Sequence, residues 1–125
     1  MTHNEISYKI RGAIFNVYNA LGPGLLESAY EAVLTYELKQ MDLQVQTQVS
    51  LPLLYNDVQL DVGYRLDILV EDKVIIEIKS VEKIQEVHHK QLLTYLKLSG
   101  KSLGVLVNFN CTEIDKSIFR KISGY

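Results

Sequence analysis

The chain has 125 residues, 47% of them hydrophobic, which suffices for one sizeable core but not for two. We therefore expect a single domain over residues 1–125. The net charge of −2 argues against a broad basic surface, so any contact with nucleic acid must rely on local positive charge. No apolar run reaches the roughly 20 residues of a membrane span. The single cysteine excludes an internal disulfide, and a cytoplasmic protein is expected.

Two helices are predicted at the start of the chain. The first spans about residues 4–21, with Asn4 as its candidate cap and a stripe of apolar side chains at helical spacing. Gly22-Pro23-Gly24 separates it from the second, which spans about residues 25–41. Glu27 begins an otherwise apolar stripe of this second helix. A glutamate in the first turn can complement the helix dipole or serve a site, and position alone leaves both open.

Three antiparallel strands are predicted next. Residues 43–55 alternate between apolar and polar side chains, which is typical of a strand with one apolar face. A turn at residues 55–57 leads toward a strand that carries Asp67. Residues 64–80 then form two apolar strands joined by the polar turn Glu71-Asp72-Lys73. With the turn centred near Asp72, Asp67 falls opposite Glu77.

Three charged side chains, Asp67, Glu77 and Lys79, interrupt these apolar strands. A charge in a buried strand is costly unless it is paired or bound to a metal. Two facing carboxylates repel each other, and Mg²⁺ or Mn²⁺, which prefer oxygen ligands, would relieve the repulsion. Lys79 shares the face of Glu77 because side chains alternate along a strand. Its ammonium would hold an attacking water or neutralise charge on a phosphoryl oxygen.

Two nearby residues leave alternatives open. Asp61 is a rival for the metal-binding aspartate, but it would lie roughly 20 Å from Asp67 along an extended strand, so Asp67 is preferred. Arg65 stands two residues before Asp67. Its guanidinium can pair with a carboxylate or contact the scissile phosphate, and the sequence does not decide between these roles.

A third helix, a strand and a short helix complete the predicted order. The third helix spans about residues 86–99 and is closed by Gly100. Leu92, Leu93 and Leu96 form its expected core face, and an adjoining face carries the side chains of His88, Gln91 and Tyr95. Adjacent helical residues diverge, so at most one of His88 and His89 can face a site. Residues 103–109 form a buried strand, expected to be parallel to the strand beside it, and a short helix is predicted over residues 115–122.

Two motifs carry a resemblance to a known family. Asp67, followed after nine residues by Glu77-Ile78-Lys79, resembles the Asp…Glu-x-Lys signature of the PD-(D/E)xK nuclease superfamily. Residues 24–30 match the Gly-x-x-Glu-x-x-Tyr pattern of a family of small proteins within it, the GxxExxY family. The resemblance covers about residues 11–109 and includes Gln91-x-x-x-Tyr95 on the third helix. Leu66 stands where the superfamily name has proline, which members of this family often lack.

The resemblance implies a fold and an activity. The fold is an α/β, restriction-endonuclease-like αβββαβ core, a mixed sheet flanked by helices, with an extra N-terminal helix. The activity is metal-dependent hydrolysis of nucleic acid, with DNA favoured over RNA. Mg²⁺ or Mn²⁺ would be bound by Asp67, Glu77 and the carbonyl of Ile78, with Glu27 in or next to the ligand set. The implied catalytic residues are Glu27, Asp67, Glu77, Lys79 and Gln91.

Two other functions remain to be weighed. A nuclease-like module could bind nucleic acid or a protein partner without cutting, but such a module gains nothing from burying three charges. A glycosidase also uses paired carboxylates, yet it has no use for a lysine two residues from one of them. Because so small a chain covers little of a duplex, a two-fold homodimer is expected.

Overall fold

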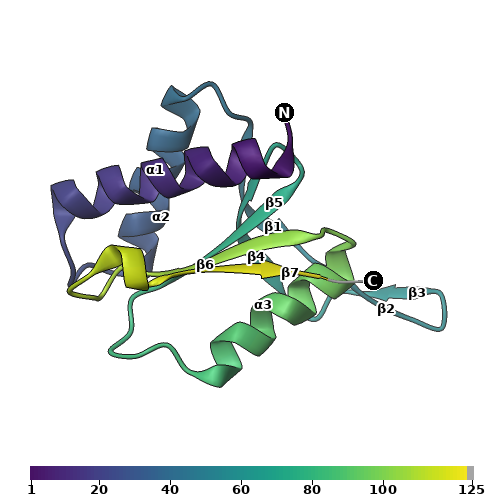
Figure 1. The fold of residues 1–125 in the computed structure, drawn as a ribbon. Helices are drawn as coiled ribbons and strands as arrows, with labels where there is room; N and C mark the ends of the chain where they lie inside the picture. The colour runs from purple at the N-terminus through teal and green to yellow at the C-terminus, as the bar shows by residue number, and fades with distance from the viewer. Residues whose placement is uncertain (124–125) are drawn as a thin grey trace.

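The computed structural model describes residues 1–123 and contains a five-stranded mixed sheet with helices on both faces (Figure 1). Helices α1 and α2 cover one face, and α3 covers the other. The elements in chain order are α1 (His3–Leu21), α2 (Glu27–Gln40), β1 (Val45–Ser50), β2 (Leu53–Tyr55), β3 (Val58–Leu60), β4 (Arg65–Val70), β5 (Val74–Lys79), α3 (Glu86–Ser99), β6 (Leu103–Asn108), a 3₁₀ turn η1 (Ile114–Lys116) and β7 (Ile118–Ile122).

The strand order of the sheet is β1-β4-β5-β6-β7. The first three strands are antiparallel, β5 and β6 are parallel, and β7 returns antiparallel at the edge. Helix α3 makes the crossover between the two parallel strands, as predicted. This is the restriction-endonuclease-like α/β architecture, with α1 as the additional N-terminal helix. No helix within residues 1–123 is both long enough and apolar enough to cross a bilayer.

The helices lie close to their predicted bounds. Helix α1 is capped by Thr2 rather than by Asn4, because the Thr2 hydroxyl accepts from the N–H of Glu5 while the Glu5 carboxylate accepts from the N–H of Thr2. Helix α3 has the predicted bounds, and Gly100 ends it in the left-handed conformation. Its core face differs from the prediction, since Leu93 is exposed and Tyr95 is buried.

Strand β1 does not keep one apolar face, contrary to the prediction. Val45 packs in the core beneath α1 and α2, whereas Val49 packs on the α3 side of the sheet. Gln48 between them has a φ of 50°, and this left-handed residue turns the strand over. Its neighbour β4 changes faces at the same level, with Leu66 on the α3 side and Ile68 on the other.

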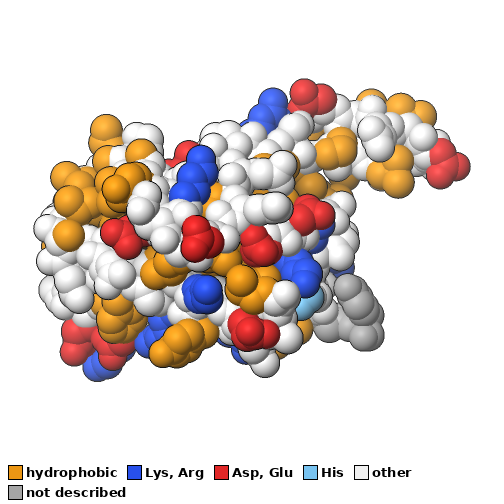
Figure 2. Space-filling view, turned by 90° about the horizontal axis from the view of Figure 1, so that it is seen from above, with side chains coloured by type: hydrophobic (Ala, Val, Ile, Leu, Met, Phe, Trp, Pro, Cys, Tyr) orange, Lys and Arg blue, Asp and Glu red, His pale blue; other side chains and the backbone are white. Residues whose placement is uncertain are grey.

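The strand predicted over residues 43–55 ends at Ser50, and residues 53–60 form a separate hairpin of β2 and β3. The hairpin projects from the body of the molecule (Figures 1 and 2). Several of its large apolar side chains are exposed, namely Leu54, Tyr55, Val58 and Leu60. This arm leads directly into β4, the strand that carries Asp67.

The end of the chain differs from the prediction of a helix over residues 115–122. Only the 3₁₀ turn at Ile114–Lys116 is helical, and Ile118–Ile122 forms β7. The pairing of β7 with β6 runs from Leu103 opposite Ile122 to Val107 opposite Ile118. This long-range ladder satisfies the backbone of β6 on its open side, which outweighs the local helical preference of a short segment.

Candidate active site

Asp67 and Glu77 lie side by side where β4 and β5 separate. The ladder between these strands pairs Ile68 with Ile76, and the next position along both strands brings the two carboxylates together, as predicted. Glu77 Oε2 accepts from the N–H of Asp67 at 2.9 Å. Asp67 Oδ2 accepts from the N–H of Ile78 at 2.8 Å. Each carboxylate therefore binds the backbone of the opposite strand, which fixes both side chains.

The two carboxylates are buried side by side. Glu77 is 3% exposed and Asp67 is half-buried, and within residues 1–123 no basic side chain lies within 4.0 Å of either one. Burial, with the neighbouring Asp67 charge, raises the pKa of Glu77 to about 8. Burial also raises the pKa of Asp67, although the hydrogen bond from the N–H of Ile78 acts to lower it. This pair favours either a proton or a bound cation.

Lys79 lies two residues beyond Glu77 at the end of β5 and is half-buried. Its backbone is fixed because its carbonyl accepts from the N–H of Phe109 at 3.0 Å. Its positive charge opposes the rise in the pKa values of both carboxylates, so it acts on them electrostatically. Within the described part of the chain, its ammonium forms no ion pair inside 4.0 Å. Lys79 is thus available to a negatively charged group that enters the site.

Glu27 approaches the carboxylates from α2. It lines a cavity of about 400 Å³ together with Asp67 and Ile78. Glu27 Oε2 accepts from the N–H of Ser80 at 3.2 Å, and Ser80 Oγ donates to the carbonyl of Leu25 at 2.6 Å. These contacts tie the start of α2 to the chain just after β5. Glu27 therefore faces the same space as Asp67, although its carboxylate already has a backbone partner.

The rest of the Gly-x-x-Glu-x-x-Tyr motif positions Glu27. Gly24 has a φ of 104°, a backbone conformation that favours glycine, and it turns the chain into α2. Tyr30 is fully buried, and its ring stacks on the ring of Phe109, just after β6, with 4.4 Å between the ring centroids. Its hydroxyl donates to the carbonyl of Gly22 and accepts from the N–H of Leu25. Gly24 and Tyr30 thus shape and hold the start of α2.

On the α3 side, a second cavity of about 530 Å³ adjoins Lys79. Gln91 lines it and donates from Nε2 to the hydroxyl of Tyr95 at 3.1 Å. His88 also lines this cavity, with its Nδ1 accepting from the N–H of Gln85. His89 instead packs edge-on against the ring of Phe119. Only one of the two histidines faces the cavity, as the helical spacing predicted.

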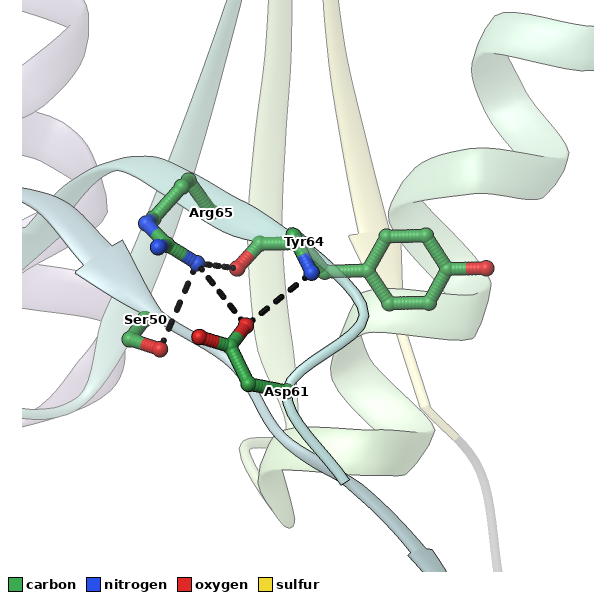
Figure 3. Close-up of polar contacts among 5 residues, drawn as sticks. Ser50, Asp61, Tyr64 and Arg65 are labelled. Carbon is green, nitrogen blue, oxygen red and sulfur yellow. Dashed lines mark hydrogen bonds and ion pairs between the residues drawn. The ribbon is translucent and has the colours of Figure 1, made fainter.

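Arg65 and Asp61 take no direct part in the carboxylate pair. Arg65 forms an ion pair with Asp61, with 3.5 Å between Nη1 and Oδ1 (Figure 3). The same Nη1 donates to the carbonyl of Tyr64 at 2.9 Å and to Ser50 Oγ at 3.4 Å. Asp61 also accepts from the N–H of Gly63. The ion-pair alternative for Arg65 is therefore the one observed, and Asp61 is engaged at the base of the hairpin.

Sequence reasoning missed three residues that support the carboxylates. Gln48 Nε2 donates to Glu31 Oε1 at 2.7 Å and more weakly to Asp67 Oδ1 at 3.5 Å. Burial raises the pKa of Glu31, which lies four residues after Glu27, a spacing that places both on one helical face. Buried Asn108 bonds both the N–H and the carbonyl of Val81 and so holds the chain after β5. The helical spacing of Glu31 was the only one of these signals present in the sequence.

The oxygen ligands present fit a small divalent cation. Asp67, Glu77 and the carbonyl of Ile78 are hard donors of the kind that Mg²⁺ and Mn²⁺ bind, and both cations retain several waters in protein sites. Residues 1–123 contain no cluster of three or more His, Cys, Asp or Glu side chains suited to a metal. The place of Glu27, in the ligand set or next to it, stays a prediction.

One of the comparisons with known proteins found a match. A family model described as the PD-(D/E)XK nuclease superfamily matches residues 4–121. No match is found among curated proteins or among solved structures. The matched range includes Glu27, Asp67, Glu77, Lys79 and Gln91. The narrower GxxExxY membership stays a prediction, whereas the chain as a whole belongs to the PD-(D/E)XK nuclease superfamily.

Proposed function

We propose that this protein is a metal-dependent nuclease that hydrolyses phosphodiester bonds in nucleic acid, with DNA favoured over RNA. The single observation that carries the proposal is the buried Asp67–Glu77 pair with Lys79 at the end of the same strand. Burying two adjacent carboxylates beside an unpaired lysine costs stability, and a purely structural site would not need this arrangement.

Asp67, Glu77 and the carbonyl of Ile78 would hold Mg²⁺ or Mn²⁺. When bound, such an ion supplies Lewis-acid stabilisation of the phosphoryl oxygens and lowers the pKa of a ligand water. Backbone hydrogen bonds orient both carboxylates before any ligand arrives. This preorganisation reduces the reorganisation that binding would otherwise require.

The remaining residues act on the water and on the phosphate. Lys79 would neutralise charge that grows on a non-bridging phosphoryl oxygen and would orient the attacking water. Glu27, which lines the cavity beside Asp67, would accept a hydrogen bond from that water. Gln91, on the other side of β5, would hold Lys79 or the substrate strand.

The non-catalytic alternative, a module that only binds nucleic acid or a protein partner, is favoured by one observation. The net charge of −2 gives weak electrostatic attraction to a phosphate backbone. We rank it second because it leaves the burial of Glu77 without a purpose. A two-fold homodimer and a cytoplasmic location are further predictions from the sequence.

Lys79→Ala tests the proposal. We expect the variant to fold as the wild type does and to lose cleavage of a labelled oligonucleotide in Mn²⁺ by at least about 100-fold. The matched control is Lys83→Ala, which removes an exposed lysine four residues further on and should leave cleavage unchanged. Cleavage by Lys79→Ala at the wild-type rate would refute the assigned site, and no cleavage by the wild type of any DNA or RNA substrate would favour the binding module.

A further inference from the structure

The cavity on the α3 side of Lys79 has an aromatic and polar lining that hydrolysis itself does not require. Its volume of about 530 Å³ lies within the range of small-ligand sites. The rings of Tyr64 and Tyr95 form part of its wall, and Gln91, Lys79 and Lys90 bring polar groups to it. We propose that this cavity receives an unpaired nucleobase of the substrate strand, so that the protein acts on single-stranded or locally unpaired nucleic acid. This inference rests on the proposed function.

Tyr64 supplies a rigid aromatic surface. Tyr64 is 40% exposed, and the centroid of its ring lies 5.7 Å from that of buried Tyr95, with the two rings tilted by 51°. Its carbonyl accepts from the N–H of Leu51 at 2.9 Å and from Arg65 Nη1 at 2.9 Å. Figure 3 shows the Tyr64 side chain directed away from the Arg65–Asp61 pair toward α3. The backbone is therefore fixed while one side of the ring stays open, as a base-stacking platform requires.

The polar groups of the cavity match the edge of a base. Gln91 uses one amide hydrogen on the hydroxyl of Tyr95. Within residues 1–123, its Oε1 and its second N–H have no further hydrogen-bond partner, and neither does the hydroxyl hydrogen of Tyr95. A donor and an acceptor thus stand beside an aromatic ring, the combination that reads the hydrogen-bonding edge of an unpaired base.

The position of the cavity links it to the proposed cleavage site. Ile78 lines the cavity that contains Asp67, and the next residue, Lys79, lines the cavity that contains Tyr64. A phosphate held at Lys79 would therefore have its neighbouring base at Tyr64. Stacking also suits a chain with a net charge of −2, because base stacking supplies affinity without many phosphate contacts.

Binding measured apart from cleavage tests the inference. The probes are a fluorescein-labelled DNA strand of about 12 nucleotides, the RNA strand of the same sequence and the blunt DNA duplex. Fluorescence anisotropy is recorded with Ca²⁺ in place of Mn²⁺, and gels verify that the probes stay intact. We expect the wild type to bind a single strand more tightly than the duplex, and the DNA and RNA arms to identify the preferred sugar.

Variants of the cavity give the decisive comparison. Tyr64→Ala should weaken single-strand binding roughly 5- to 100-fold, while Tyr64→Phe keeps the ring and the affinity. Thr94→Trp, which fills the cavity from an exposed position on α3, should weaken binding similarly. Tyr36→Ala removes an exposed tyrosine of α2 outside the cavity and serves as the control.

The outcomes separate this inference from the proposed function. Unchanged single-strand binding by both Tyr64→Ala and Thr94→Trp would overturn the base site, as would duplex binding tighter than single-strand binding. If cleavage depends on Lys79 while Tyr64→Ala and Thr94→Trp both bind normally, only the base site fails. If single strands bind through Tyr64 but are never cut, only the proposed nuclease activity fails.

Discussion

Asp67 and Glu77 belong to the sheet as much as to the site, because each carboxylate replaces a backbone carbonyl as hydrogen-bond acceptor where β4 and β5 separate. The arrangement fixes both side chains, but it also keeps Glu77 out of water. At the scale of single residues, the site therefore contains a titratable group that destabilises the folded protein when it is buried in its charged form. The cost depends on pH.

The metal-free protein should lose stability as the pH rises from about 4.5 to about 8. Glu77 has a pKa of about 8 in the folded protein against 4.5 for an ordinary glutamate, so the folded state retains a proton that the unfolded chain releases. The contribution of Glu77 to stability is thus fully present below the pKa of the unfolded chain, and it is lost as the pH rises to the pKa of the folded protein. The free energy of unfolding is measured with urea in EDTA at about pH 5 and pH 8. Between these pH values, the wild type should lose up to about 4 kcal/mol more of this free energy than Glu77→Gln does.

Glutamine has the shape of glutamate and still accepts from the N–H of Asp67, so the comparison isolates the charge. Glu82→Gln changes an exposed glutamate and should follow the wild-type pH dependence. If Glu77→Gln loses as much stability with rising pH as the wild type does, the buried carboxylate is not the cause.

At the scale of elements, the sequence predicted correctly those helices and turns whose conformation depends on residues close together in the chain. Helix α3 was found from its periodicity and from Gly100, whose left-handed conformation ends it. The opposition of Asp67 and Glu77 followed from a short turn between two apolar strands. Strand β7 was missed because pairing with β6, some fifteen residues distant in sequence, decides its conformation. The reversal of β1 was missed because glutamine rarely adopts a positive φ.

That reversal predicts an asymmetry between neighbouring positions of β1. Gln48→Val should lower the free energy of unfolding by about 1–2 kcal/mol, because a β-branched residue is strained at a φ of 50°. Gln46→Val places valine at an exposed position with ordinary strand geometry, opposite Leu69, and should change stability by less than about 0.5 kcal/mol. Denaturant midpoints of the two variants measure the difference, and equal midpoints would show that Gln48 is not strained.

At the scale of the whole molecule, the end of β5 separates two cavities. Glu27 and Asp67 lie on the α2 side, and Tyr64 and Gln91 lie on the α3 side with Lys79. The sequence predicted the charged residues because charges in apolar strands are conspicuous. It did not predict the contacts of Gln48 and Asn108 or the cavity lined by Tyr64 and Tyr95. These features depend on how β1, β6 and α3 pack around β5.

The central claim is that Asp67 and Glu77 form a site for a divalent cation, and calorimetric titration with Mn²⁺ tests it most directly. We expect the wild type to bind Mn²⁺ at millimolar concentration or below and Asp67→Asn to lose this binding. Asparagine can still accept from the N–H of Ile78, so the fold should persist. Asp61→Asn, which removes a carboxylate paired with Arg65 outside the site, should bind as the wild type does. Absence of Mn²⁺ binding in the wild type, or equal binding by Asp67→Asn, would contradict the account.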